Sequence, residues 1–412
     1  MICGLVGLLM IVLPASLIAH NDKIHDANNS LCEDEIAKKT ALHSFADLRC
    51  CLEPGRNVQE CLDHRLANFA GDRETRTLLD KLATESAQDT RVERTCHEIV
   101  HAIGRRAFER THNIGTAINE CTTQCQAGCY HGTIERMFFA DAEDTGSMRH
   151  ITPQELRTKI RTACSVVPAG LPEQAFHIQC SHGLGHALLY TFDYQLQQAL
   201  ESCDLLRDIV DQRSCYLGVF MENVIGKIEG DGDLKEDDPL YPCTVVSDKY
   251  KESCYKQQTK VMIFMGKTPA QIARLCSETG AYRKVCFEGL GRDTSEPART
   301  GDAPRIAHIC EDNAGTFVSD CVGGAARALV DFSWNARHAY RYCSALTQGE
   351  VRSRCFSVAQ SHLRWAYGQD QQAIEEGCRL YAGPETIRCF LAAGTGNNAP
   401  WWRKIFTSFF TP

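Results

Sequence analysis

The chain opens with one long apolar run, and no later stretch is as apolar over a comparable length. Residues 2–19 are almost entirely hydrophobic and end on Ala-Ser-Leu-Ile-Ala, where small residues form a plausible cleavage site. The sequence therefore predicts a signal peptide over residues 1–19. Because no Lys or Arg precedes the apolar run, an uncleaved N-terminal membrane anchor is the alternative. No later segment has the length needed to span a bilayer.

Beyond the leader, hydrophobic helical segments alternate with short polar turns. Residues 271–276 are typical of the end of a helix, residues 277–281 contain a glycine and indicate a turn, and residues 282–291 are typical of a second helix. A disulfide between Cys276 and Cys286 would hold this helical hairpin at its turn.

Cysteines repeat this hairpin along the second half of the chain. The later cysteine of each expected pair recurs every 32 to 39 residues, and its partner lies 10 to 12 residues before it. The expected bridges are Cys203 to Cys215, Cys243 to Cys254, Cys276 to Cys286, Cys310 to Cys321, Cys343 to Cys355 and Cys378 to Cys389. A period near 34 is that of a helix-turn-helix repeat, so we predict an all-α, right-handed α-solenoid of disulfide-stapled hairpins. Its period and hairpin plan resemble Sel1-like and tetratricopeptide repeats, although their consensus residues are absent.

Upstream of residue 200 the cysteine spacing is less regular. Pairs that fit the pattern are Cys51 with Cys61, Cys164 with Cys180, and Cys129 with either Cys121 or Cys125. Cys32, Cys50, Cys96 and the remaining member of the 121/125 pair have no assigned partner, because spacing does not determine connectivity.

A small residue follows the later cysteine by three positions in most units. These positions are Gly132, Gly183, Gly218, Gly289, Gly324 and Ala392. Glycine inside a helix costs about 1 kcal/mol relative to alanine, so its recurrence indicates that neighbouring helices approach closely there.

Cysteine content also indicates the compartment. Twenty-three cysteines in 412 residues favour an oxidising location, secreted or periplasmic. Loss of the leader removes Cys3 and leaves 22, an even number that suits complete pairing. A net charge of −8 argues against a nucleic-acid partner, and 43% hydrophobic residues suffice for a substantial core.

The chain divides by pattern into five parts. We expect a signal peptide over 1–19, a helical cap over 20–95, histidine-rich helical units over 96–200, cysteine-paired repeats over 201–393, and a linker with an aromatic tail over 394–412. Aromatic and basic residues in the tail could give a weak contact with a membrane surface or cap the last repeat.

Candidate chemistry lies where three cysteines are each followed by two potential metal ligands four residues apart. That spacing places both side chains of a pair on one face of a helix. The first pair begins one residue after its cysteine and the other two begin two residues after, a difference of about 100° on a helix. If three such helices lie side by side, their ligands converge on one or two transition-metal ions such as zinc, iron or copper. The predicted ligands are His97, His101, His131, Glu135, His182 and His186.

The first pair, His97 and His101, also fits a known sequence motif. Residues 97–101 match the HExxH motif of zinc metallopeptidases over a stretch of about ten residues. The resemblance implies that two histidines hold zinc, that Glu98 is the catalytic base, and that Glu135 supplies the third ligand. Members of that class carry a β-sheet before the motif helix, and the sequence predicts no strands here. Ala107 stands where the extended metzincin motif needs a histidine.

These patterns predict a metalloprotein, and specifically a metal-dependent hydrolase or oxidoreductase acting on a protein, peptide or small molecule. The alternative is a non-enzymatic scaffold that binds a protein or glycan. In that case the histidines would make hydrogen bonds between packed helices without a metal.

Overall fold

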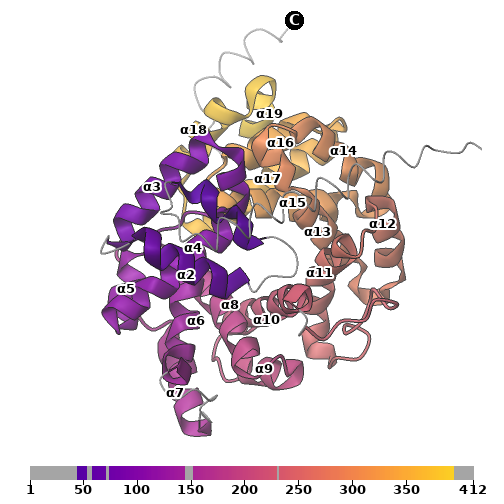
Figure 1. The fold of residues 1–412 in the computed structure, drawn as a ribbon. Helices are drawn as coiled ribbons and strands as arrows, with labels where there is room; N and C mark the ends of the chain where they lie inside the picture. The colour runs from indigo at the N-terminus through magenta and orange to yellow at the C-terminus, as the bar shows by residue number, and fades with distance from the viewer. Residues whose placement is uncertain (1–43, 53–57, 71–73, 144–151, 230–231, 394–412) are drawn as a thin grey trace, which may run out of the picture.

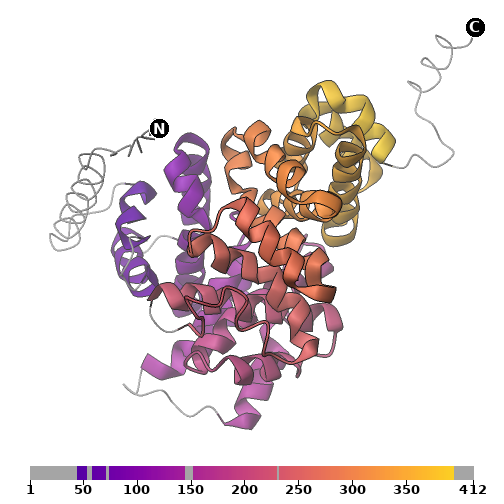
Figure 2. The same cartoon turned by 90° about the vertical axis from the view of Figure 1, so that its right-hand side faces the viewer.

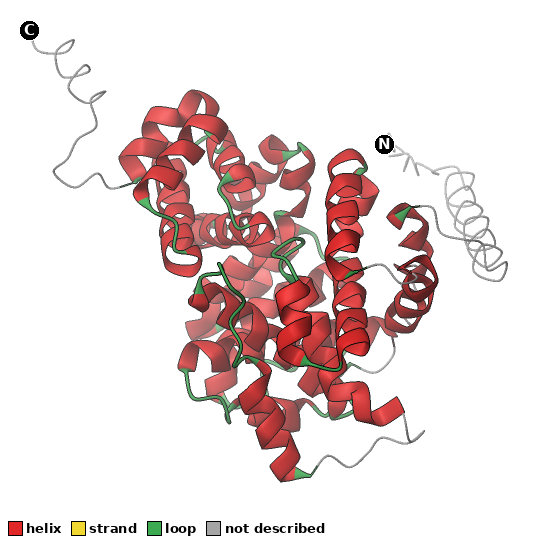
Figure 3. Ribbon diagram, turned by 90° about the vertical axis from the view of Figure 1, so that its left-hand side faces the viewer, coloured by secondary structure: helices red, strands yellow, loops and turns green. Residues whose placement is uncertain are grey.

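The computed structural model describes residues 44–52, 58–70, 74–143, 152–229 and 232–393. Within these ranges the secondary structure is helical and no strand occurs, which confirms the predicted all-α class (Figure 3). The predicted leader, Cys32 and the C-terminal aromatic tail lie outside the described residues.

Helices follow one another through short connections. The elements of the N-terminal half are η1 (Phe45–Leu52), α2 (Val58–Ala70), α3 (Thr75–Gln88), α4 (Thr90–Thr111), α5 (Ile114–Glu120), α6 (Gly128–Glu143), α7 (Pro153–Ala163), α8 (Glu173–Thr191), α9 (Leu196–Cys203) and α10 (Ile209–Glu229). Those of the C-terminal half are α11 (Asp248–Phe264), α12 (Pro269–Glu278), η2 (Gly280–Tyr282), α13 (Arg283–Thr294), η3 (Glu296–Thr300), α14 (Ala303–Asn313), η4 (Gly315–Phe317), α15 (Val318–Ser333), α16 (Arg337–Ala345), α17 (Gly349–Tyr367), α18 (Gln371–Tyr381), η5 (Gly383–Glu385) and α19 (Thr386–Ala392).

The hairpin formed by α12 and α13 shows how the sequence sets these boundaries. Thr268 caps α12 in a capping box with Gln271, and Pro269 occupies the first helical position. The turn predicted at 277–281 contains the end of α12 and the beginning of the short η2, and α13 then packs against α12.

One helix from each successive unit packs beside the next in chain order. The series is α4, α6, α8, α10, α11, α13, α15, α17 and α19, and α12, α14, α16 and α18 form a second layer. The series curves back on itself, because α17 contacts α8 (Figure 1). Figure 2 shows the indigo N-terminal helices and the orange to yellow C-terminal helices at the same end of the molecule. The open solenoid and its handedness stay predictions, whereas packing in chain order is observed.

Disulfides staple the units as predicted. All six expected bridges of the repeat region are present, as are the bridges Cys51 to Cys61 and Cys164 to Cys180. Of the open cases, Cys129 pairs with Cys121, and Cys125 pairs with Cys96. Cys50 is disulfide-bonded as well.

Glycines lie where adjacent helices come closest. A Cβ added to Gly132 on α6 would lie 1.8 Å from the carbonyl oxygen of His101 on α4, and one on Gly218 would lie 2.0 Å from that of His182. These contacts confirm the close approach predicted from the recurring small residues. They bring the backbones of the histidine-bearing helices together.

Candidate metal centre

The predicted ligands come together from three neighbouring helices, α4, α6 and α8. Ring centroids of neighbouring imidazoles lie 4.6 to 5.9 Å apart across the group. The group comprises His97, His101, His131, His182 and His186, and Glu135 is hydrogen-bonded to His101. Although the first pair is offset by one residue from its cysteine, His97 and His101 still point into the group. Cys96 bridges to Cys125 and not within a hairpin, so it does not mark the same helix position as Cys129 and Cys180.

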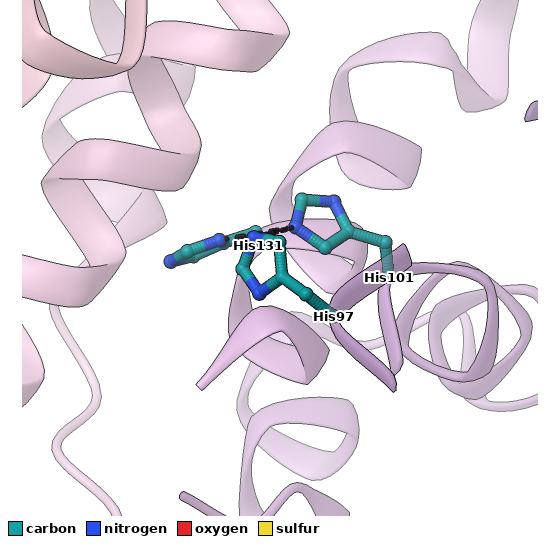
Figure 4. A group of neighbouring side chains, drawn as sticks. All are labelled: His97, His101 and His131. Carbon is teal, nitrogen blue, oxygen red and sulfur yellow. Dashed lines mark hydrogen bonds between the residues drawn. The ribbon is translucent and has the colours of Figure 1, made fainter. Parts of the chain in front are cut away.

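His97 and His101 face each other through their Nε2 atoms, which lie 3.2 Å apart (Figure 4). His97 donates its Nδ1 hydrogen to the backbone carbonyl of Cys125 at 2.7 Å, and His101 donates its Nδ1 hydrogen to Glu135 Oε1 at 2.8 Å. A carbonyl and a carboxylate accept but do not donate, so these bonds place a hydrogen on Nδ1 of both rings. The Nε2 of each ring is therefore the nitrogen left to act as a ligand.

His131 presents its Nδ1 to the same point. Its Nδ1 lies 3.2 Å from His101 Nε2, while its Nε2 donates to Gln179 Oε1 at 3.2 Å. The Tyr367 hydroxyl fixes the orientation of this amide. It donates to Asp331 and lies within reach of the Gln179 side chain, whose amide nitrogen is the donor that suits it. The Gln179 oxygen is thus left for His131.

Burial favours the neutral form of three rings in the group. It lowers the pKa values of His97, His131 and His182 well below the usual range, and the neighbouring imidazoles lower them further. If His101 is also neutral, three lone pairs converge on one point, an arrangement that a cation would stabilise. One ligand nitrogen from each of His97, His101 and His131 lies within 4.8 Å of the other two. Tetrahedral zinc with bonds of about 2.0–2.1 Å holds its nitrogens about 3.3 Å apart.

Glu135 lies behind His101 and orients it. Its second oxygen accepts from Arg105 at 2.8 Å, and Arg105 also pairs with Asp63 at 2.8 Å. Burial alone would raise the pKa of Glu135, but His101 and Arg105 outweigh that effect and hold the pKa well below its usual range. A carboxylate that accepts from the far nitrogen of a histidine is typical of the surroundings of a metal site.

His186 has the same arrangement on the other side of the group. Its Nδ1 donates to Glu222 Oε2 at 2.7 Å, and Glu222 also accepts from the Tyr194 hydroxyl at 3.1 Å. The remaining Nε2 of His186 is buried and has no hydrogen-bond partner among the described residues. With neutral His182 beside it, this nitrogen could ligate a second ion.

Glu98 stands apart from the group. Its side chain is exposed, and its negative charge favours the charged form of Arg299. The hydrogen bonds of Glu135 join it to His101 and Arg105, and His131 occupies the third ligand position that the metallopeptidase resemblance gave to Glu135. The three cysteines at 121, 125 and 129 are all in disulfides.

Sequence reasoning missed Gln179 and Glu222, which orient His131 and His186. The repeat spacing in the sequence could have identified Glu222. Glu135 follows His101 by 34 residues and Glu222 follows His186 by 36, and both intervals equal about one repeat. In a stack of equal units, residues one period apart lie on adjacent helices.

No family model matches the chain, and neither a curated protein nor a solved structure is detectably similar to it.

Proposed function

We propose that the protein binds a transition-metal ion through His97 Nε2, His101 Nε2 and His131 Nδ1. The observation that supports this proposal is the convergence of three ring nitrogens whose opposite ring nitrogens each donate a hydrogen bond. Imidazole ligands suit zinc, iron, copper and nickel. A set of three protein ligands leaves a coordination position open for water or substrate, as in catalytic sites.

The open position supports a metal-dependent enzyme, either a hydrolase or an oxidoreductase. Bound zinc would lower the pKa of a water and supply a nucleophile, whereas iron or copper would supply redox chemistry. His97, His101 and His182 are only partly buried. His186 Nε2 supports a second ion beside the first.

A secreted or periplasmic location is part of this proposal. Its support is the series of disulfides, which indicates an oxidising compartment. None of the helices in the described ranges has the length and apolar character required of a membrane span.

Metal analysis tests the proposal directly. Protein folded in an oxidising compartment should contain one or two equivalents of a transition metal by plasma mass spectrometry, and His131→Ala should lose most of it. His308→Ala on α14 is the matched control, because His308 interacts with Glu311 outside the group and should leave the metal content unchanged.

Metal-free protein that takes up no zinc, iron or copper would overturn the metal proposal. If such protein kept its fold and disulfides, the non-enzymatic scaffold would become the better function. Metal content that is equal in wild type and in His131→Ala would place the ion elsewhere.

A further inference from the structure

A cavity of about 660 Å³ lies on the inner side of the curved series of helices. Its walls come from α8, α10, α11, α13, α15 and α17, so it depends on the contact between α17 and α8. The volume falls in the range typical of small-molecule sites. Tyr367 lines it and lies within reach of Gln179, the acceptor for His131, so the cavity neighbours the candidate metal centre.

Basic side chains dominate the charge of this cavity. The lining contains five of them, Arg213, Lys256, Arg292, Arg327 and Arg354, and two carboxylates, Glu252 and Asp331. The chain as a whole carries a net charge of −8. A basic cavity inside an acidic protein concentrates positive potential where surrounding low-dielectric walls strengthen it.

Two acidic residues outside the lining offset this positive charge only in part. Glu288 forms ion pairs with Arg327 at 2.9 Å and with Lys256 at 3.6 Å, and Asp293 forms an ion pair with Arg292 at 2.7 Å. Burial lowers the pKa of Lys256, and the negative charges of Glu288 and Asp331 offset that lowering only in part.

Both carboxylates of the lining already have partners. Glu252 pairs with Arg213 at 3.5 Å. Asp331 accepts from His362 at 2.6 Å and from the Tyr367 hydroxyl. Trp365 also lines the cavity and is 54% exposed, which leaves an aromatic face for the apolar part of a ligand.

We propose that this cavity binds a small organic anion, whose carboxylate or phosphate group pairs with Lys256 and Arg327 while its apolar part packs on Trp365. Arg and Lys form charge-assisted hydrogen bonds with carboxylates and phosphates, and these bonds are stronger than those between neutral groups. The proposal rests on the cavity and its charges, and it holds whether or not the neighbouring histidines bind a metal.

Calorimetric titration of the full chain with phenyl phosphate, benzoate and benzyl alcohol tests the proposal. We expect at least one of the two anions to bind at least tenfold more tightly than the neutral alcohol of similar shape. Preference between the anions distinguishes a phosphate ligand from a carboxylate ligand. Equal affinity for all three would overturn the proposal.

Substitutions locate the binding. Lys256→Gln should weaken binding of the preferred anion about tenfold or more, whereas Lys284→Gln, an exposed lysine outside the cavity, should leave it unchanged. If circular dichroism shows that Lys256→Gln does not fold, Arg327→Gln serves in its place. Wild-type affinity in folded forms of these cavity variants would overturn the proposal.

Chelator-treated protein separates this site from the metal centre. Anion binding should persist after the metal is removed, because its partners are side chains. Loss of binding on chelation, followed by recovery on adding metal back, would show that the anion binds the ion and would overturn the cavity site.

Discussion

Two carboxylates orient histidines in this protein by accepting their Nδ1 hydrogens, Glu135 for His101 and Glu222 for His186. In each case the other nitrogen of the ring points into the histidine group. The carboxylates therefore decide which nitrogen is available as a ligand.

Replacing one of these acids should weaken metal binding while leaving the ligands in place. We expect Glu135→Gln to lower metal affinity by about 10- to 100-fold, because the ring of His101 loses its anionic acceptor. Competition with a chromophoric chelator measures this change. Glu109→Gln on α4, which removes an exposed pair with Arg136, is the control, and an unchanged affinity in Glu135→Gln would contradict the orienting role.

Neutral buried histidines also predict how the stability of the metal-free protein depends on pH. The pKa values of His97, His131 and His182 are lowered well below 6.5 in the folded state, whereas in the unfolded chain they return to about 6.5. Below that pH the unfolded state binds more protons, so the free energy of unfolding should fall as pH drops from about 6.5 to 5. It should be nearly constant above about pH 7.5.

Thermal unfolding of chelated protein between pH 8 and 5 measures this dependence. His131→Gln should show a shallower decrease in Tm because one of the three groups is gone. Identical slopes in both proteins would show that His131 does not titrate as its burial requires.

The sequence predicted the ligands at the residue scale better than their surroundings. Histidine pairs at a spacing of four are visible in a single chain, and they identified the side chains that the structure brings together. Gln179 carries no such pattern, because an amide is common on helices and its role arises only from a contact with Tyr367 nearly 190 residues later. The catalytic role assigned to Glu98 stays untested, and its side chain is exposed.

At the scale of helices, close packing against glycine sets the distance between ligands. Gly132 lets α6 approach the backbone of α4 at His101, and Gly183 lets α8 approach α6 at His131. Metal ligands must be held within about 0.5 Å of their working positions, so the spacing of these helices is part of the centre.

Gly132→Ala should therefore abolish metal binding although no ligand changes. The added Cβ would lie 1.8 Å from the His101 carbonyl oxygen, and relieving this clash requires the helices to separate by roughly 1.5 Å. Metal content and Tm should both fall. Gly323→Ala is the control on α15, since its Cβ would stay 3.7 Å from the nearest side chain, and full metal content in Gly132→Ala would refute the argument.

Two disulfides should differ in what their removal costs. Replacing Cys276 and Cys286 by alanine opens a ten-residue loop and should cost about 3 kcal/mol with no loss of metal. Replacing Cys96 and Cys125 should cost a similar amount and also weaken metal binding, because the Cys125 carbonyl accepts from His97. Denaturant unfolding and metal analysis of both variants test this, and retained metal in the second would contradict it.

At the scale of the whole molecule, the sequence predicted the repeat but not its closure. Cysteine spacing determines which helices form a hairpin, because each bridge of the repeat region lies within one unit. Curvature accumulates from small rotations between units, and no local pattern records it. The contact between α8 and α17, and the basic cavity that it encloses, could therefore not be predicted.

That contact has a consequence for the order in which the protein matures. Every proposed ligand lies between residues 97 and 186, so all of them leave the ribosome before α17 is made. Tyr367, which fixes Gln179 and through it His131, arrives only when most of the chain has been synthesised. A nascent chain can thus carry the full ligand set early, while its centre reaches its final hydrogen bonding only after the last repeats have docked.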